Sequence, residues 1–165
     1  MEVEAKFTVS DEAAFARLEA AAELAGYALE AGEPRQDRDT FLDTPGRAFL
    51  AAGYYLRRRE TGGGVRLALK QLAAAEDGVM RREELEALVA ADVPVGEWPA
   101  GVLRERVEKI AGGEPLEPLL TLGQERRARR VTRGGAEVAE LSLDRVLVAA
   151  ADGEHRWLEV EVETR

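Results

Sequence analysis

Residues 2–7 read Glu-Val-Glu-Ala-Lys-Phe, and this alternation of charged and apolar residues decides the fold class. Successive side chains of an extended strand point to opposite faces, so Glu2, Glu4 and Lys6 share one face. The alternation returns near the C-terminus, where residues 158–163 read Leu-Glu-Val-Glu-Val-Glu. Two carboxylates on one strand face can hold a divalent cation, and a neighbouring lysine can meet an anion that the cation brings. The two stretches therefore predict acidic strands that bind a metal.

The composition excludes several classes of protein. The chain has 165 residues, of which 45% are hydrophobic and 33% charged, as in a globular protein. It contains no cysteine, which excludes disulfides and thiolate metal sites. No apolar run approaches the roughly 20 residues that span a bilayer, and the acidic residues Glu2 and Glu4 are not typical of a signal peptide. The net charge of -9 disfavours nucleic-acid binding. We expect a single domain over residues 1–165, cytoplasmic, with neither membrane nor nucleic acid as a partner.

Turn signals and apolar periodicity predict mostly strands. Helices are expected at residues 11–25 and 102–111, with a helical turn at 50–53; strands are expected at 2–9, 27–31, 38–43, 54–60, 65–71, 119–131, 137–143, 146–149 and 156–163. Residues 79–89 fit a helix or a strand, and Asp144-Arg145 resembles a tight turn. Because the connections are short, an antiparallel sheet that closes on itself is the expected architecture.

Basic residues fall at alternate positions in the central strands. Counting one face of each strand gives seven bases and six acids: Lys6, Arg57, Arg59, Lys70, Arg82, Arg127 and Arg129, with Glu2, Glu4, Glu84, Glu86, Glu159 and Glu161. A half-exposed sheet with cross-strand ion pairs would explain any one strand. Across six strands, however, the acids gather at the chain ends and the bases between them. Such a cluster of cations suggests a bound polyanion, and hence a metal-plus-polyphosphate site.

Six short motifs, in order, connect the chain with a known family. They are Glu-x-Glu-x-Lys at residues 2–6, Thr-Phe-Leu-Asp-Thr-Pro at 40–45, Leu-Arg-Arg-Arg at 56–59, Leu-Ala-Leu-Lys at 67–70, Arg-Glu-Glu at 82–84 and Glu-Val-Glu at 159–161. Each motif alone is weak, but together they cover nearly the whole chain. The chain resembles the CYTH family, also called triphosphate tunnel metalloenzymes.

The resemblance implies a mainly β (α+β) fold, an eight-stranded antiparallel closed β-barrel forming a tunnel, with two or three flanking helices. It implies that Mg²⁺ or Mn²⁺ is held by Glu2, Glu4, Glu159 and Glu161. It further implies that phosphate oxygens are bound by Lys6, Arg57, Arg59, Lys70, Arg82, Arg127 and Arg129. Lys6 and Glu84 are the expected catalytic residues. The expected activity is metal-dependent hydrolysis of a triphosphate, with inorganic triphosphate as the leading substrate.

Other functions remain open within the resemblance. Thiamine triphosphate or ATP could be the substrate, ATP hydrolysis being replaced by cyclisation in some family members. A third hypothesis is a non-catalytic module that binds polyphosphate. Bacterial members of the family are often fused to a CHAD domain, which is implicated in polyphosphate binding and is therefore the expected partner domain. The family usually continues into a helix and a Ser-Lys segment, whereas this chain ends at Arg165. We therefore expect an excised domain or a reduced member, and the oligomeric state stays open.

Overall fold

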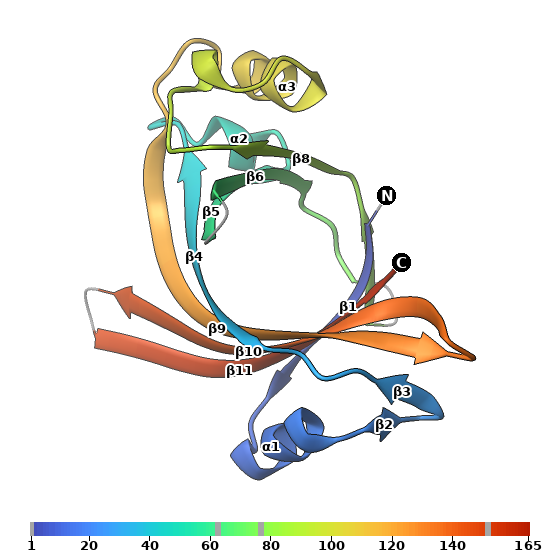
Figure 1. The fold of residues 1–165 in the computed structure, drawn as a ribbon. Coiled ribbons are helices and arrows are strands. Elements are labelled where there is room, and N and C mark those ends of the chain that lie inside the picture. The colour runs from blue at the N-terminus through green and yellow to red at the C-terminus, as the bar shows by residue number, and fades with distance from the viewer. Residues whose placement is uncertain (1, 62–63, 76–77, 151–152) are drawn as a thin grey trace. The chain divides into compact units, whose positions relative to one another are not determined.

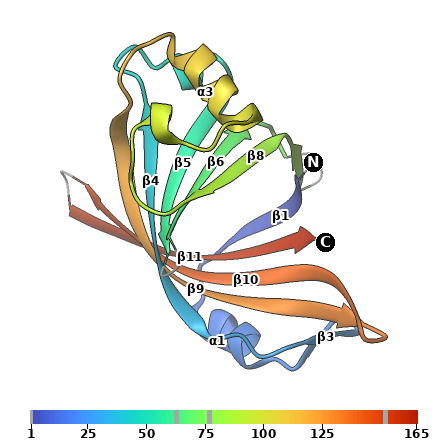
Figure 2. The same cartoon turned by 45° about the horizontal axis from the view of Figure 1, so that its top comes forward.

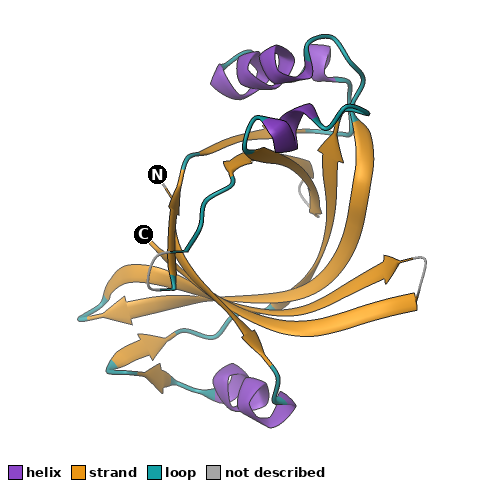
Figure 3. Ribbon diagram, turned by 180° about the vertical axis from the view of Figure 1, so that it is seen from behind, coloured by secondary structure: helices purple, strands orange, loops and turns teal. Residues whose placement is uncertain are grey.

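The computed structural model describes residues 2–61, 64–75, 78–150 and 153–165, with the backbone alone for Glu2 and Ala150. Strands dominate these residues (Figure 3). The strands are β1 (Glu2–Val9), β2 (Glu23–Leu24), β3 (Tyr27–Leu29), β4 (Pro34–Asp43), β5 (Tyr54–Thr61), β6 (Gly64–Gln71), β7 (Val79–Arg82), β8 (Glu84–Val89), β9 (Glu117–Arg133), β10 (Ala136–Ala150) and β11 (Gly153–Thr164). The helices are α1 (Glu12–Ala20), α2 (Ala48–Ala51), α3 (Val102–Ala111) and a short 3-10 helix (Val95–Glu97).

The chain divides into two compact units. Unit 1 contains residues 37–73 and 82–122, and unit 2 contains residues 2–36, 74–81 and 123–165. Strands β4, β7 and β9 contribute residues to both units. In unit 1 the strand order is β9-β4-β5-β6-β8, and in unit 2 it is β7-β1-β11-β10-β9. The β1–β11, β10–β11, β4–β5, β5–β6 and β6–β8 pairs are all antiparallel.

In unit 2, α1 with β2 and β3 covers one face of the sheet (Figure 1). Asp11 caps the helix, its Oδ1 accepting the Ala13 N–H at 2.9 Å. Phe15 of α1 is fully buried in an apolar cluster with Leu141, Leu143 and Val160 of the sheet. Because side chains alternate along a strand, the residues between these apolar positions lie on the opposite face. Lys6, Asp144, Glu159 and Glu161 therefore share the face that α1 does not cover, whereas Arg145 of β10 lies on the α1 face and pairs with Glu12 and Glu19.

In unit 1, α2 and α3 pack over β5, β6 and β8 (Figure 2). The buried apolar cluster there includes Phe49 of α2, Leu56 of β5 and Val107 of α3. The Asp43 carboxylate fixes the start of α2, accepting the backbone N–H groups of Thr44 at 2.8 Å and Phe49 at 2.9 Å. As in unit 2, alternate residues of each strand form a second, charged face.

The fold class predicted from the sequence is confirmed: the protein is mainly β and antiparallel, and the described part of the chain contains three α-helices. The predicted turn at Asp144-Arg145 is wrong, because both residues lie inside the continuous strand β10. The first helix is shorter than expected and ends at Ala20, before the short β2–β3 hairpin. The ambiguous residues 79–89 form two strands, β7 and β8. None of the described helices has the length and apolar character to cross a membrane.

Candidate metal and phosphate site

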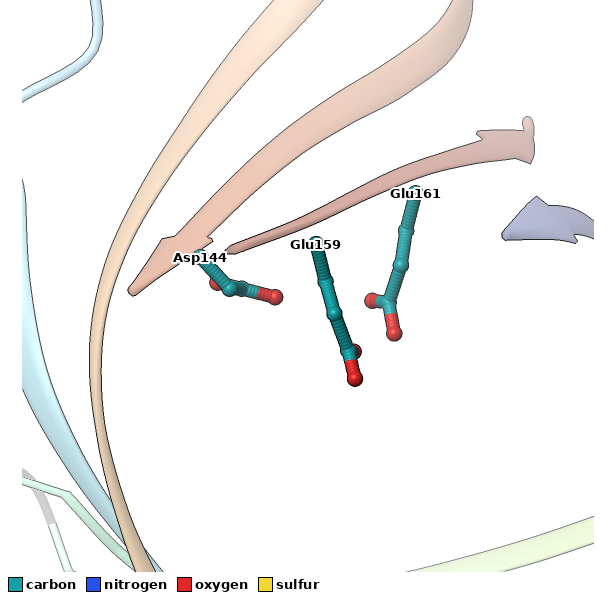
Figure 4. A group of neighbouring side chains, drawn as sticks. All are labelled: Asp144, Glu159 and Glu161. Carbon is teal, nitrogen blue, oxygen red and sulfur yellow. The ribbon is translucent and has the colours of Figure 1, made fainter. Parts of the chain in front are cut away.

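Three carboxylates of unit 2 form the acidic cluster, which comprises Asp144, Glu159 and Glu161. Asp144 of β10 pairs directly with Glu159 of β11, and Glu161 is two residues further along β11. Each offers a carboxylate oxygen, and these oxygens all lie within 4.8 Å of one another. The three side chains extend from the same side of the two strands (Figure 4). Since Asp144 is fully buried, the cluster needs compensating positive charge.

Lys6 of β1 supplies part of this charge. It pairs with Glu161 in the β1–β11 ladder, which places it on the face of the acidic cluster. Its Nζ lies 2.7 Å from Glu159 Oε2 and 2.8 Å from Glu161 Oε1. The Lys6 side chain is 39% exposed, compared with 13% for Glu159 and 15% for Glu161. An ammonium group thus sits between two members of the cluster.

Arg126 of β9 supplies the remaining charge. Its Nε donates to Asp144 Oδ1 at 2.7 Å, and its Nη2 donates to both Asp144 Oδ2 and Glu161 Oε2, the latter at 2.7 Å. The planar guanidinium therefore bridges two carboxylates from different strands. Glu159 has a further donor, the indole N–H of Trp157. Each carboxylate of the acidic cluster is oriented by at least one donor from its surroundings.

The charges around Glu161, Lys6 and Arg126 shift the pKa of each of these groups toward its charged form. Burial by itself would raise the pKa of Glu161, but the Arg126 and Lys6 charges outweigh it and lower that pKa to about 2. Burial would lower the pKa of Lys6, yet Glu161 and Glu159 hold it above its usual value. The pKa of Arg126 is likewise raised, burial being outweighed by Asp144 and Glu161. Glu161 and Lys6 are both charged at neutral pH.

The acidic cluster fits a hard divalent cation. Mg²⁺ and Mn²⁺ prefer oxygen ligands, and carboxylates from adjacent strands provide them. The Lys6 ammonium, lying between two of the carboxylates, marks a position where positive charge is already stabilised. Three carboxylates with Lys6 and Arg126 give these five groups a formal sum of one negative charge. The donor set and its charge both suit a metal.

The charged face of unit 1 carries most of the remaining predicted bases. In the β4–β5 ladder Asp39 pairs with Arg59, whose Nε and Nη2 both donate to the Asp39 carboxylate at 2.6 Å. Asp37 lies 3.5 Å from Arg59 Nη1. The Arg59, Asp37 and Asp39 side chains are all at most 7% exposed. These buried charges are paired, as buried charges must be.

The charged face of unit 1 carries three further predicted bases: Arg57, Lys70 and Arg82. Lys70 pairs with Glu84 across β6 and β8, with Nζ 3.0 Å from Glu84 Oε1. Arg82 lies over the ring of Tyr55 at 5.7 Å from its centroid. Arg57 approaches Asp39 only to 3.8 Å, and its buried Nε has no hydrogen-bond partner among the described residues. Arg57 thus has buried donor capacity that an anion could use.

Comparison with known proteins places the chain in a family. The CYTH domain matches over residues 1–165. The chain belongs to the CYTH family. No curated protein matches it in sequence.

Solved structures share the fold at low sequence identity. HpAC1 from Hippeastrum, a protein stated to have a dominant triphosphatase activity, superposes with a TM-score of 0.74 at 22% identity, over 99% of this chain and 80% of that one. PH1819 from Pyrococcus horikoshii gives 0.58 at 20% identity, over 100% and 78%. The Mimivirus capping enzyme triphosphatase gives 0.52 at 10% identity, over 99% and 80%. At these identities the likeness establishes the CYTH fold alone.

Three of the site residues predicted from the sequence lie together in unit 2 of this CYTH domain, namely Lys6, Glu159 and Glu161. Glu4 is buried on the same face of β1 but is not among the three carboxylates of the acidic cluster. The side chain of Glu2 lies outside the described residues. The metal-binding roles of all these glutamates stay predictions.

Arg127 and Arg129 are not part of the acidic cluster. The Arg129 guanidinium donates to the backbone carbonyls of Leu18 and Leu29, at 3.0 Å each, and also to those of Glu19 and Glu30. Burial and the neighbouring Arg127 charge lower the pKa of Arg129. On β9 it is Arg126 that contacts the acids. Phosphate binding by Arg127 and Arg129 stays a prediction.

Sequence reasoning missed four charged residues: Asp37, Asp39, Arg126 and Asp144. Asp37 and Asp39 alternate in phase along β4, a signal of the kind used for β1 and β11. They pair with the bases of unit 1, so the positive and negative charges there are less segregated than the sequence suggested. Asp144 was missed as a site residue because Asp-Arg between two apolar runs is also typical of a turn.

Proposed function

We propose that this protein hydrolyses a triphosphate in a reaction that depends on Mg²⁺ or Mn²⁺, and that inorganic triphosphate is its preferred substrate. The acidic cluster with its Lys6 and Arg126 counter-ions is the observation that carries the proposal. Membership of the CYTH family supports it. The triphosphatase activity stated for the Hippeastrum protein with the same fold supports it further.

The divalent cation would be held by Asp144, Glu159 and Glu161, with Glu4 as a further candidate ligand on β1. When bound, it would supply charge neutralisation for phosphate oxygens and activation of water. Arg126 orients two of the carboxylates, through its hydrogen bonds to Asp144 and Glu161.

The bases of unit 1 would bind phosphate oxygens. Arg57 and Arg59 offer planar guanidinium groups, which suit phosphate, and Lys70 adds a point charge. Asp39 orients Arg59, and Glu84 orients Lys70, at 2.6 and 3.0 Å. We therefore assign Glu84 the role of positioning Lys70. Phosphoryl transfer depends mainly on such positioning and on charge stabilisation.

Inorganic triphosphate is preferred over nucleotide substrates because the charged face of unit 1 offers little for a base. Its aromatic residues Phe41 and Tyr55 pack on each other at 5.6 Å between ring centroids. Arg82 covers the Tyr55 ring. These rings are thus already engaged with protein groups.

Phosphate release with Mg²⁺ or Mn²⁺, measured on inorganic triphosphate, thiamine triphosphate, ATP and pyrophosphate in parallel, tests the proposal. Release that is fastest from inorganic triphosphate and abolished by EDTA is expected. A protein that is inactive on all four compounds, yet is stabilised against heat by triphosphate, would instead be a polyphosphate-binding module.

A further inference from the structure

The Lys6 ammonium occupies a position between two of the carboxylates that would hold the cation. Its Nζ is within hydrogen-bond distance of both Glu159 and Glu161, at 2.7 and 2.8 Å. A divalent cation bound by the same two carboxylates would meet this ammonium at close range, where like charges repel strongly. Lys6 and the cation therefore compete for the same oxygens.

Of the two counter-ions, Lys6 is the one that can move. Arg126 is 11% exposed and is held by three hydrogen bonds to two carboxylates, in a planar geometry. Lys6 is 39% exposed, and its ammonium ends a flexible four-carbon side chain. The cost of moving the Lys6 group into a more solvated position is therefore smaller than that of moving Arg126.

The formal charges favour this exchange. With Lys6 in place, the acidic cluster and its two counter-ions carry one net negative charge. When Lys6 moves away, the three carboxylates and Arg126 carry two, which a divalent cation neutralises. The displaced ammonium is then available for an anion.

We propose that Lys6 is an exchangeable counter-ion, which neutralises Glu159 and Glu161 in the cation-free protein and which the divalent cation displaces toward the phosphate groups. This inference rests on the proposed function for the identity of both ligands. In this exchange, Lys6 can contact phosphate only after the cation has bound. By thermodynamic reciprocity, triphosphate binding through Lys6 strengthens cation binding by the same factor.

Calorimetric titration with Mn²⁺, in the absence of any phosphate compound, tests the exchange. Lys6→Met keeps an unbranched side chain of similar length and removes the charge. Lys109→Met, at an exposed position on α3, is the matched control. We expect Lys6→Met to bind Mn²⁺ about tenfold more tightly than the wild type, and the control to match the wild type.

Equal affinity in Lys6→Met and wild type would overturn the exchange and leave the cation site intact. Absence of Mn²⁺ binding in all three proteins would overturn the proposed function as well.

A second measurement distinguishes displacement from a general charge effect and does not depend on the variant folding. The chain has only three lysines, so their side-chain NMR signals can be assigned individually. During titration of the wild type with Mg²⁺, we expect the Lys6 Nζ signal to shift toward that of a solvated lysine while Lys109 stays unchanged. A Lys6 signal that does not move while Mg²⁺ binding saturates would contradict the proposal.

Discussion

Arg126 and Asp144 form a buried ion pair beside the candidate metal site. The Arg126 Nε lies 2.7 Å from Asp144 Oδ1, and the side chains are 11% and 1% exposed. The same guanidinium reaches Glu161 at 2.7 Å. One arginine of β9 thus links β10 and β11 through two of the proposed metal ligands. The stability of unit 2 and the geometry of two proposed metal ligands are therefore connected through a single side chain.

Replacing Arg126 is expected to destabilise the protein. Arg126→Met leaves the buried Asp144 without its main counter-ion, which should lower the free energy of unfolding by about 3 kcal/mol. Urea denaturation in the presence of EDTA measures this. Arg130→Met is the matched control, because the Arg130 side chain is 62% exposed and its pairing with Glu30 is superficial. Equal stability of the two variants would show that Arg126 and Asp144 do not form the buried pair.

Asp144→Asn should weaken Mn²⁺ binding at least tenfold, because it removes one anionic ligand while keeping the side-chain volume. Calorimetric titration measures the change. Asp92→Asn, whose side chain is 61% exposed and lies in unit 1, serves as the control and should bind Mn²⁺ like the wild type. Wild-type affinity in Asp144→Asn would remove Asp144 from the ligand set.

Much of the fold was predictable, because it follows from strand periodicity. The alternation in residues 2–7 and 158–163 determines which side chains share a face, so Lys6, Glu159 and Glu161 could be grouped before their contacts were known. The antiparallel arrangement followed from short connections. Element type was most secure where the pattern was longest.

What could not be predicted depended on pairing between strands. Consecutive arginines at 126 and 127 must face opposite sides, but only the β9–β10 pairing decides which of them meets Asp144. The alanine-rich stretch up to Ala25 has high helix propensity throughout, yet the chain leaves the helix at Ala20 to form the β2–β3 hairpin. In both cases the outcome is decided by pairing between strands and not by the local sequence.

The stability of the cation-free protein should depend on pH through Glu161. Its pKa of about 2 lies below the ordinary value of 4.5, so its ionised form is stabilised by folding. The contribution, about 3 kcal/mol, is present above pH 4.5 and is lost as the pH falls toward 2. Denaturation in EDTA across this range measures it. Glu161→Gln should flatten the profile, and an unchanged profile in that variant would assign the acid sensitivity to other groups.

Arg57→Met should raise the KM for triphosphate about tenfold or more with little loss of stability. Arg57 has an unused buried Nε and only a distant contact with Asp39, so its charge is available to phosphate. Steady-state kinetics and thermal unfolding measure the two effects. Arg17→Met is the control, since the Arg17 side chain lies on α1 and is 72% exposed. An unchanged KM in Arg57→Met would exclude a substrate contact by this residue.

The most direct test of the proposed function is the initial rate of phosphate release from inorganic triphosphate with Mn²⁺, measured for the wild type and Glu161→Gln together. We expect a rapid, EDTA-sensitive rate for the wild type and a loss of at least 100-fold for Glu161→Gln. A variant that retains the wild-type rate, or a wild type that releases no phosphate, would contradict it.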